Sequence, residues 1–130
     1  MKNDLFFMKR AYEQALLGFN KQEIPVGAVV VYEDEIISEA HNKSISKTDP
    51  TSHAEIEAIR DAALKIGNYR LTDATMYVTL EPCLMCCGAL IHARFDKVIF
   101  STKDQKSGAV ISNGNLLEAD FINHLVKFKQ

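Results

Sequence analysis

Two short stretches of this sequence contain the side chains that proteins use to bind a metal and to move protons. His53 and Glu55 stand two residues apart, and Cys83 and Cys86 form a C-x-x-C pair directly after Pro82. One imidazole and two thiolates are three ligands for Zn²⁺, and the fourth position of such a tetrahedral site holds water in catalytic zinc centres. A carboxylate beside that water can take its proton and pass it to a leaving group. These residues predict a hydrolytic zinc centre with Glu55 as its catalytic carboxylate.

Each motif has a simpler interpretation when it is taken alone. Ser52 and Glu55 fit a capping box, whose side chains only satisfy backbone N–H groups at a helix start. Cys87 is an alternative ligand to Cys86, and a fourth protein ligand would make the site structural; the candidates for it are His41, His92 and His124. The joint occurrence of the motifs favours the catalytic interpretation, because H-x-E together with P-C-x-x-C is the signature of zinc-dependent nucleobase deaminases.

The elements that position these residues follow from hydrophobic periodicity and turn signals. We expect helices over residues 4–19, 53–66, 83–94 and 116–120, and strands over residues 26–32, 35–41, 75–80, 97–102 and 124–128. The first two strands should form an antiparallel hairpin, and the third and fourth should be parallel because a helix connects them. The prediction is an α/β protein with a mixed five-stranded sheet flanked by helices.

The predicted helices also have expected faces. In the first helix, the apolar stripe that should pack on the sheet is Leu5, Met8, Tyr12, Ala15, Leu16 and Phe19. Cys83 and Cys86 should lie in the first turn of one helix, while His53 and Glu55 should open another. Helical side chains lean toward the N-terminus, so both pairs are expected to point at one metal ion lying between two helix starts.

Length and composition limit the possible classes of protein. At 130 residues the chain is expected to form a single domain, residues 1–130. The three cysteines are odd in number, no apolar run fits a signal peptide, and none is long enough to span a membrane. We therefore expect a cytoplasmic protein with reduced thiols and no membrane partner. The net charge of −2 gives no general basic field for nucleic acid, although Arg94, Lys103 and Lys106 fall near the predicted site in sequence.

The sequence resembles the bacterial tRNA-specific adenosine deaminases, which belong to the cytidine deaminase-like superfamily. The resemblance runs without obvious gaps from the first helix to residue 124. The matching positions are residues 25–31, 42, 49–56, 68–71, 77–83, 85–86, 88–89, 91–92, 94, 104, 106 and 108. The zinc motif specifies only the superfamily, whereas the segments 91–94 and 103–108 favour the tRNA branch.

This resemblance implies a fold, a reaction and roles for named residues. The fold is the three-layer cytidine deaminase-like fold. The reaction is hydrolytic deamination of adenosine to inosine at the wobble position of a tRNA anticodon loop, by zinc-bound hydroxide with Glu55 as proton shuttle. One Zn²⁺ per subunit would be held by His53, Cys83 and Cys86. The resemblance also implies substrate contacts from Asn42 and Asp104, binding of the anticodon stem-loop, and a homodimer.

The sequence departs from the family pattern at two places, and two other functions compete. Lys43 and Ser44 follow Asn42 where the family commonly has Arg-Pro, and the usual further C-terminal helix is expected to be absent. A deaminase of free purine bases or nucleosides, similar to guanine deaminase, would need the same zinc and carboxylate and no basic surface. A structural zinc module that binds a partner is the third possibility, and it would not need Glu55 for activity.

Overall fold

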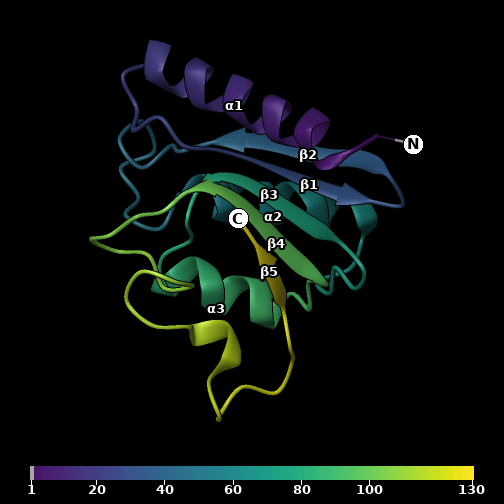
Figure 1. Ribbon diagram of the computed structural model, residues 1–130. Coiled ribbons are helices and arrows are strands. Elements are labelled where there is room, and N and C mark those ends of the chain that lie inside the picture. The colour runs from purple at the N-terminus through teal and green to yellow at the C-terminus, as the bar shows by residue number, and fades with distance from the viewer. Residues whose placement is uncertain (1) are drawn as a thin grey trace.

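The computed structural model describes residues 2–130, in which a five-stranded sheet has helices on both faces (Figure 1). The helices are α1 (Asp4–Asn20), α2 (Ala54–Ile66), α3 (Leu84–His92) and the short 3₁₀ helix η1 (Leu116–Glu118). The strands are β1 (Gly27–Tyr32), β2 (Glu35–His41), β3 (Thr75–Leu80), β4 (Lys97–Thr102) and β5 (Lys127–Lys129). Their order is β2-β1-β3-β4-β5; β1 is antiparallel to β2 and β3, while β4 is parallel to β3 and β5. The predicted mixed sheet is confirmed.

Strand β1 is buried on both faces because its alternate side chains enter two different cores. Val29 and Val31 pack in a cluster with residues of α1, whereas Ala28 and Val30 pack in a larger cluster with residues of α2 and α3. A strand buried in this way has a continuous apolar run rather than an alternating pattern. Helix α1 lies on one side of the sheet and α3 on the other, which gives the predicted three layers (Figure 1).

Helix α1 forms as predicted but packs on the sheet through a different face. Its buried residues are Phe7, Ala11, Ala15 and Gly18. Of the predicted stripe only Ala15 is fully buried, and the exposed members are Leu5, Tyr12, Leu16 and Phe19. The reason is close backbone contact: a Cβ on Gly27 would lie 1.9 Å from the carbonyl oxygen of Ala11. Small residues let the helix approach β1, and this contact decided which face is buried.

The other elements match the predictions apart from shifts at their ends. Helix α2 ends at Gly67, whose φ of 76° is the predicted left-handed cap. Helix α3 ends at His92, two residues earlier than predicted, and the chain then turns through Arg94 at a φ of 66°. The predicted last helix is shortened to η1, and β5 begins at Lys127 rather than residue 124. The His124 ring is bonded to the Phe95 carbonyl oxygen at 2.7 Å.

The connections place several element ends at one end of the sheet. Helix α3 follows β3 after three residues, so its N-terminus lies at the carboxyl end of that strand. This is where α/β proteins commonly place their sites. No helix in the described part of the chain is both long and apolar enough to cross a membrane.

Candidate active site

The three predicted metal ligands lie together between the starts of two helices. His53 is the N-cap of α2 and Cys83 is the N-cap of α3, and neither side chain is used as a cap. Cys86 lies in the first turn of α3. The Nδ1 atom of His53 is 3.6 Å from the Sγ atom of Cys83 and 3.6 Å from the Sγ atom of Cys86. The predicted convergence of the two motifs is therefore confirmed.

The distances among these donor atoms fit a tetrahedral zinc ion. With a Zn–S bond of about 2.3 Å and a Zn–N bond of about 2.0 Å, ideal tetrahedral angles put nitrogen and sulfur about 3.5 Å apart. Both observed nitrogen–sulfur separations are 3.6 Å. His53, Cys83 and Cys86 form a group of potential metal ligands whose donor atoms all lie within 4.8 Å of one another. Three protein donors leave one tetrahedral position open, which is the pattern of a catalytic site.

The two thiols are prepared for different protonation states. Hydrogen bonding from the Cys86 thiol, opposed by burial and helped by the Cys86 backbone N–H, lowers the pKa of Cys83 to about 5. The pKa of Cys86 is raised because its thiol donates to Cys83 and is buried. Zinc binds cysteine as the thiolate, and the positive end of the helix dipole at a helix N-terminus stabilises this form. The pair therefore holds one thiolate before any cation adds its own charge.

The carboxylate of Glu55 is buried beside this group, with an exposed fraction of 4%. Desolvation raises its pKa to about 7, although its own backbone N–H and His53 act in the opposite direction. A carboxyl group with a pKa near neutrality exchanges protons readily at physiological pH. The environment of Glu55 thus suits a proton carrier.

The capping-box interpretation of Ser52 and Glu55 is wrong. His53, not Ser52, occupies the N-cap position of α2, and no side-chain cap bond is formed there. The Ser52 hydroxyl instead donates to the Asp49 carboxylate at 2.9 Å. The turn that contains Asp49 therefore fixes the residue just before the histidine.

A cavity of about 170 Å³ opens onto the predicted site. Its lining residues are Ile24, Val26, Asn42, His53, Glu55, Leu80, Glu81, Cys83, Asp104 and Ser107. Drug-sized ligands occupy pockets of roughly 300 Å³ or more, so this cavity has room for about one flat heterocycle. Five of the six predicted site residues line it, and Cys86 lies buried behind them.

The two predicted substrate-binding residues are held in defined orientations. The buried Asn42 accepts a hydrogen bond from the Ser44 N–H through Oδ1 at 2.9 Å, which leaves its amide NH₂ as a donor. Asp104 accepts from the N–H groups of Lys106 and Ser107 through Oδ1, both at 3.1 Å. Asp104 therefore also shapes the turn in which it lies.

The sequence analysis gave no role to Glu81, which the structure places in the cavity wall. Its side chain is 2% exposed and accepts hydrogen bonds from the segment of residues 104–112. Burial alone would raise its pKa, but the Ser112 hydroxyl and backbone N–H groups outweigh it and lower the pKa of Glu81 to about 2. In the sequence, the only feature that marks Glu81 is its place between a predicted strand and Pro82. Its hydrogen-bond partners are far along the chain, so no local pattern indicates them.

The alternative metal ligands lie elsewhere. The Cys87 thiol donates to the Pro82 carbonyl at 3.8 Å. His41 is bonded to the Asn42 carbonyl at 2.8 Å, and His92 is exposed. Among residues 2–130, none of these joins the metal-ligand group, and neither does His124. The site therefore keeps its open position.

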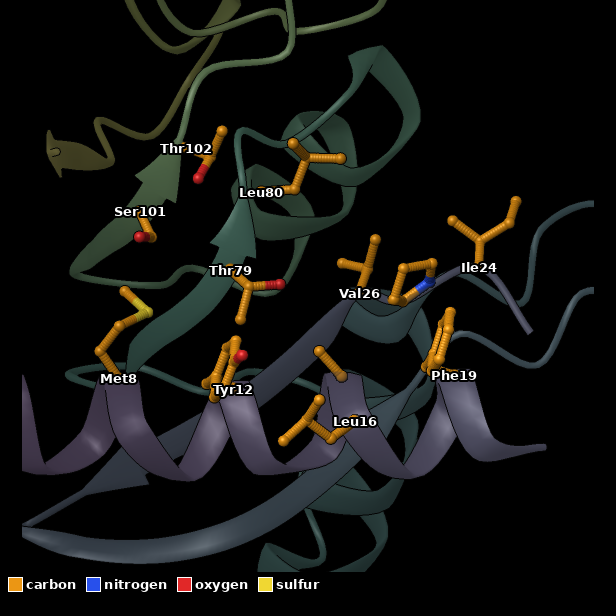
Figure 2. A pocket seen from close by; sticks show the side chains of 12 residues that line it. Met8, Tyr12, Leu16, Phe19, Ile24, Val26, Thr79, Leu80, Ser101 and Thr102 are labelled. Carbon is orange, nitrogen blue, oxygen red and sulfur yellow. The ribbon is translucent and has the colours of Figure 1, made fainter. Parts of the chain in front are cut away.

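A larger apolar groove of about 650 Å³ adjoins the small cavity and shares Ile24, Val26 and Leu80 with it. Figure 2 shows Met8 and Tyr12 on α1 facing the ends of β3 and β4 across this groove, which Leu16 also lines. These are the α1 side chains that the sequence analysis expected to be buried. Carboxyl, imidazole and thiol groups are absent from its lining, so the chemistry is confined to the small cavity.

Comparison with known proteins identifies the family. The profile of the cytidine and deoxycytidylate deaminase zinc-binding region matches residues 1–102. A tRNA-specific adenosine deaminase of Aquifex aeolicus is 47% identical over 124 residues, which are 95% of this chain and 82% of that protein. The chain belongs to the zinc-dependent deaminases of this family. The sequence resemblance to the tRNA-specific branch is confirmed.

Solved structures extend the likeness of this deaminase to the whole fold. A chain from a study of A-to-I editing by tRNA:A34 deaminases at the wobble position of transfer RNA superposes with a TM-score of 0.93 at 35% identity. The alignment covers 97% of this deaminase and 98% of that chain. Guanine deaminase from Bacillus subtilis gives a TM-score of 0.76 at 41% identity over 78% of this deaminase and 66% of that chain. The cytidine deaminase-like fold is confirmed.

Proposed function

We propose that this deaminase converts adenosine to inosine at the wobble position of a tRNA anticodon loop. The observation that carries the proposal is the placement of Glu55 and three metal donors around one base-sized cavity in a chain 47% identical to a tRNA-specific adenosine deaminase. The high coverage of both chains in the tRNA:A34 deaminase superposition supports it as well. Residues 1–130 would act as a single catalytic domain.

In this proposal His53, Cys83 and Cys86 hold one zinc ion per subunit. When bound, zinc supplies a Lewis acid that lowers the pKa of water at its open position. Glu55 accepts one proton of the attacking water as its oxygen bonds to C6 of the purine, and delivers this proton to ring nitrogen N1. The same carboxylate then takes the remaining proton from the hydroxyl on C6 and delivers it to the amine, so that the C–N bond breaks, ammonia leaves and C6 becomes a carbonyl. The buried position of Glu55 and its raised pKa support this role.

The substrate contacts follow from the cavity and its rim. A cavity of about 170 Å³ admits a base but not a whole nucleotide, so the target base must leave its stack. A loop nucleotide is already single-stranded, so extruding its base costs little unpairing and stacking energy. The amide NH₂ of Asn42 would donate to an acceptor on the base. Asp104 would lie by the sugar-phosphate chain, where a 2′-OH distinguishes RNA from DNA.

We further propose that the enzyme binds the anticodon stem-loop of the tRNA and that it works as a homodimer in the cytoplasm. The names of the relatives support tRNA as the substrate class.

A second candidate is deamination of a free purine base. It is favoured by the 41% identity to Bacillus subtilis guanine deaminase and by the net charge of −2, which offers no general attraction to RNA. Its cavity requirement is the same, because a free base and an extruded base have the same size.

A substrate panel with a matched pair of variants tests the proposal. The zinc-loaded protein is assayed for ammonia and inosine on a stem-loop RNA with a wobble adenosine, the same hairpin in DNA, guanine and cytidine. We expect product from the RNA, and a loss of about a hundredfold or more with Glu55→Gln while zinc content is unchanged. Asp61→Asn, an exposed carboxylate on the same helix, is the control. Turnover of guanine with none on RNA would favour the second candidate.

A further inference from the structure

Glu81 contacts residues 104–112, which are distant in sequence. This segment lies beside residues 81–83, the turn that carries the potential ligand Cys83 and that we call the metal-ligand turn. The Oε2 atom of Glu81 accepts three backbone hydrogen bonds, from Val110 at 3.0 Å, Ile111 at 2.8 Å and Ser112 at 3.0 Å. Its Oε1 atom accepts from the backbone N–H of Asp104 at 3.1 Å and from the Ser112 hydroxyl at 2.5 Å. Every group that faces this carboxylate in these contacts is a donor.

This arrangement requires a carboxylate rather than an amide. A glutamine has one acceptor oxygen, so its NH₂ would face either the three N–H groups or the N–H of Asp104. Hydrogen bonds from several N–H groups also offset the cost of burying the negative charge of Glu81. The segment of residues 104–112 is therefore fixed by one anion at both of its ends.

Two further contacts tie the same segment to the metal-ligand turn. The Ala109 N–H donates to the Pro82 carbonyl at 2.9 Å, and Gly108 forms an isolated antiparallel bridge with Cys83. A Cβ on Gly108 would lie only 2.3 to 2.5 Å from the carboxyl atoms of Glu81. The backbone at Gly108 therefore packs so closely against the Glu81 carboxylate that this position has no room for a side chain.

We propose that Glu81 is a positioning residue that couples the metal-ligand turn to residues 104–112 and so holds Asp104 and Ser107 in the wall of the substrate cavity. Glu81 directly follows β3 and directly precedes Pro82, while Asp104 and Ser107 line the cavity with His53. Without this anchor the part of the cavity wall formed by Asp104 and Ser107 loses its fixed position, whereas the metal donors stay at the starts of α2 and α3. The effect belongs to substrate binding rather than to the chemical step.

Amide hydrogen exchange on the zinc-loaded protein tests this coupling without any substrate. In Glu81→Gln we expect the amides of Asp104, Val110, Ile111 and Ser112 to exchange about tenfold faster or more, because each loses a charged acceptor. Zinc content and the exchange of α2 amides should stay as in the wild type. Glu39→Gln, a carboxylate on β2 paired with Arg10, is the control and should leave the segment protected.

The kinetic arm rests on the proposed function. On the stem-loop RNA we expect Glu81→Gln to raise KM about tenfold or more while kcat changes less than about threefold. Gly108→Ala should reproduce this split, since its new Cβ displaces the same carboxylate. Ser112→Ala, which removes a single donor, should give a smaller rise in KM. This variant tests the positioning role of Glu81 if Glu81→Gln does not fold.

The outcomes separate the two proposals. Unchanged exchange of residues 104–112, or an equal loss of zinc and of protection over the whole chain, would overturn the positioning role. Absence of wild-type turnover on RNA would count against the proposed function alone, because the exchange result needs no substrate.

Discussion

Two buried glutamates next to the metal-ligand group show how surroundings give one residue type different roles. Glu55 is 4% exposed, and burial raises its pKa to about 7. Glu81 is 2% exposed, yet the Ser112 hydroxyl and several backbone N–H groups overcome the effect of burial and lower its pKa to about 2. The number of hydrogen-bond donors decides the difference. The first glutamate can exchange a proton near neutral pH, and the second remains an anion that anchors backbone.

Asp49, in the turn before His53, is expected to make stability depend on pH. Hydrogen bonds from the Thr51 N–H, the Thr51 hydroxyl and the Ser52 hydroxyl lower its pKa to about 2, from an ordinary value of 3.8. Because the unfolded chain binds this proton more tightly, the stabilisation is complete well above pH 3.8 and is lost as the pH falls through 2. Asp49→Asn should therefore be less stable than the wild type at pH 7, with the difference shrinking toward pH 2.

Urea unfolding at pH 7, 5, 4 and 3 measures this difference. Asp61→Asn, whose carboxylate is exposed on α2, shows the effect of removing a charge without these bonds. A gap between wild type and Asp49→Asn that stays constant from pH 7 to pH 3 would contradict the assigned role of the turn.

At the scale of elements, the sequence predicted which segments are helices and strands better than it predicted their contacts. Strand β2 and strand β3 begin and end at the residues predicted from their apolar residues and the neighbouring turn signals. Helix α1 also lies where expected, but periodicity selected an apolar face that the structure leaves largely exposed. Which face is buried depends on Gly27, whose missing side chain permits a close approach that only the folded chain reveals.

Two glycine substitutions test whether this close approach stabilises the fold. In Gly27→Ala the new Cβ would collide with the Ala11 carbonyl, so α1 must shift from the sheet at a cost of about 3 kcal/mol. In Gly67→Ala nothing lies within 4 Å, and only the left-handed φ of 76° is unfavourable, at a cost of about 1 kcal/mol. The free energy of unfolding in urea measures both. Equal costs would mean that α1 does not depend on contact with β1.

At the scale of the whole molecule, local motifs were predictable and long-range contacts were not. The potential metal donors His53, Cys83 and Cys86 were identified because each motif is short and its spacing reflects helix geometry. The contacts of Glu81 were missed because its donors lie 23 to 31 residues away along the chain. No periodicity records such a contact. The groove beside α1 was missed for the same reason, because it forms only when α1 packs on the sheet through the face that the structure shows.

The net charge of −2 means that any attraction to RNA must come from a local group of lysines. Lys103 and Lys106 are exposed on either side of Asp104, which lines the small cavity together with His53 and Glu55. If both contact phosphates, replacing either with alanine should weaken binding of the anticodon stem-loop and reduce the slope of log Kd against log salt by about 1. Lys65→Ala is the control, because this exposed lysine lies near the far end of α2, about 16 Å along the helix from its start. Fluorescence anisotropy over a salt series gives the slopes, and deamination at saturating RNA should be unchanged. Slopes equal to that of Lys65→Ala would show that RNA binds on another face of the molecule.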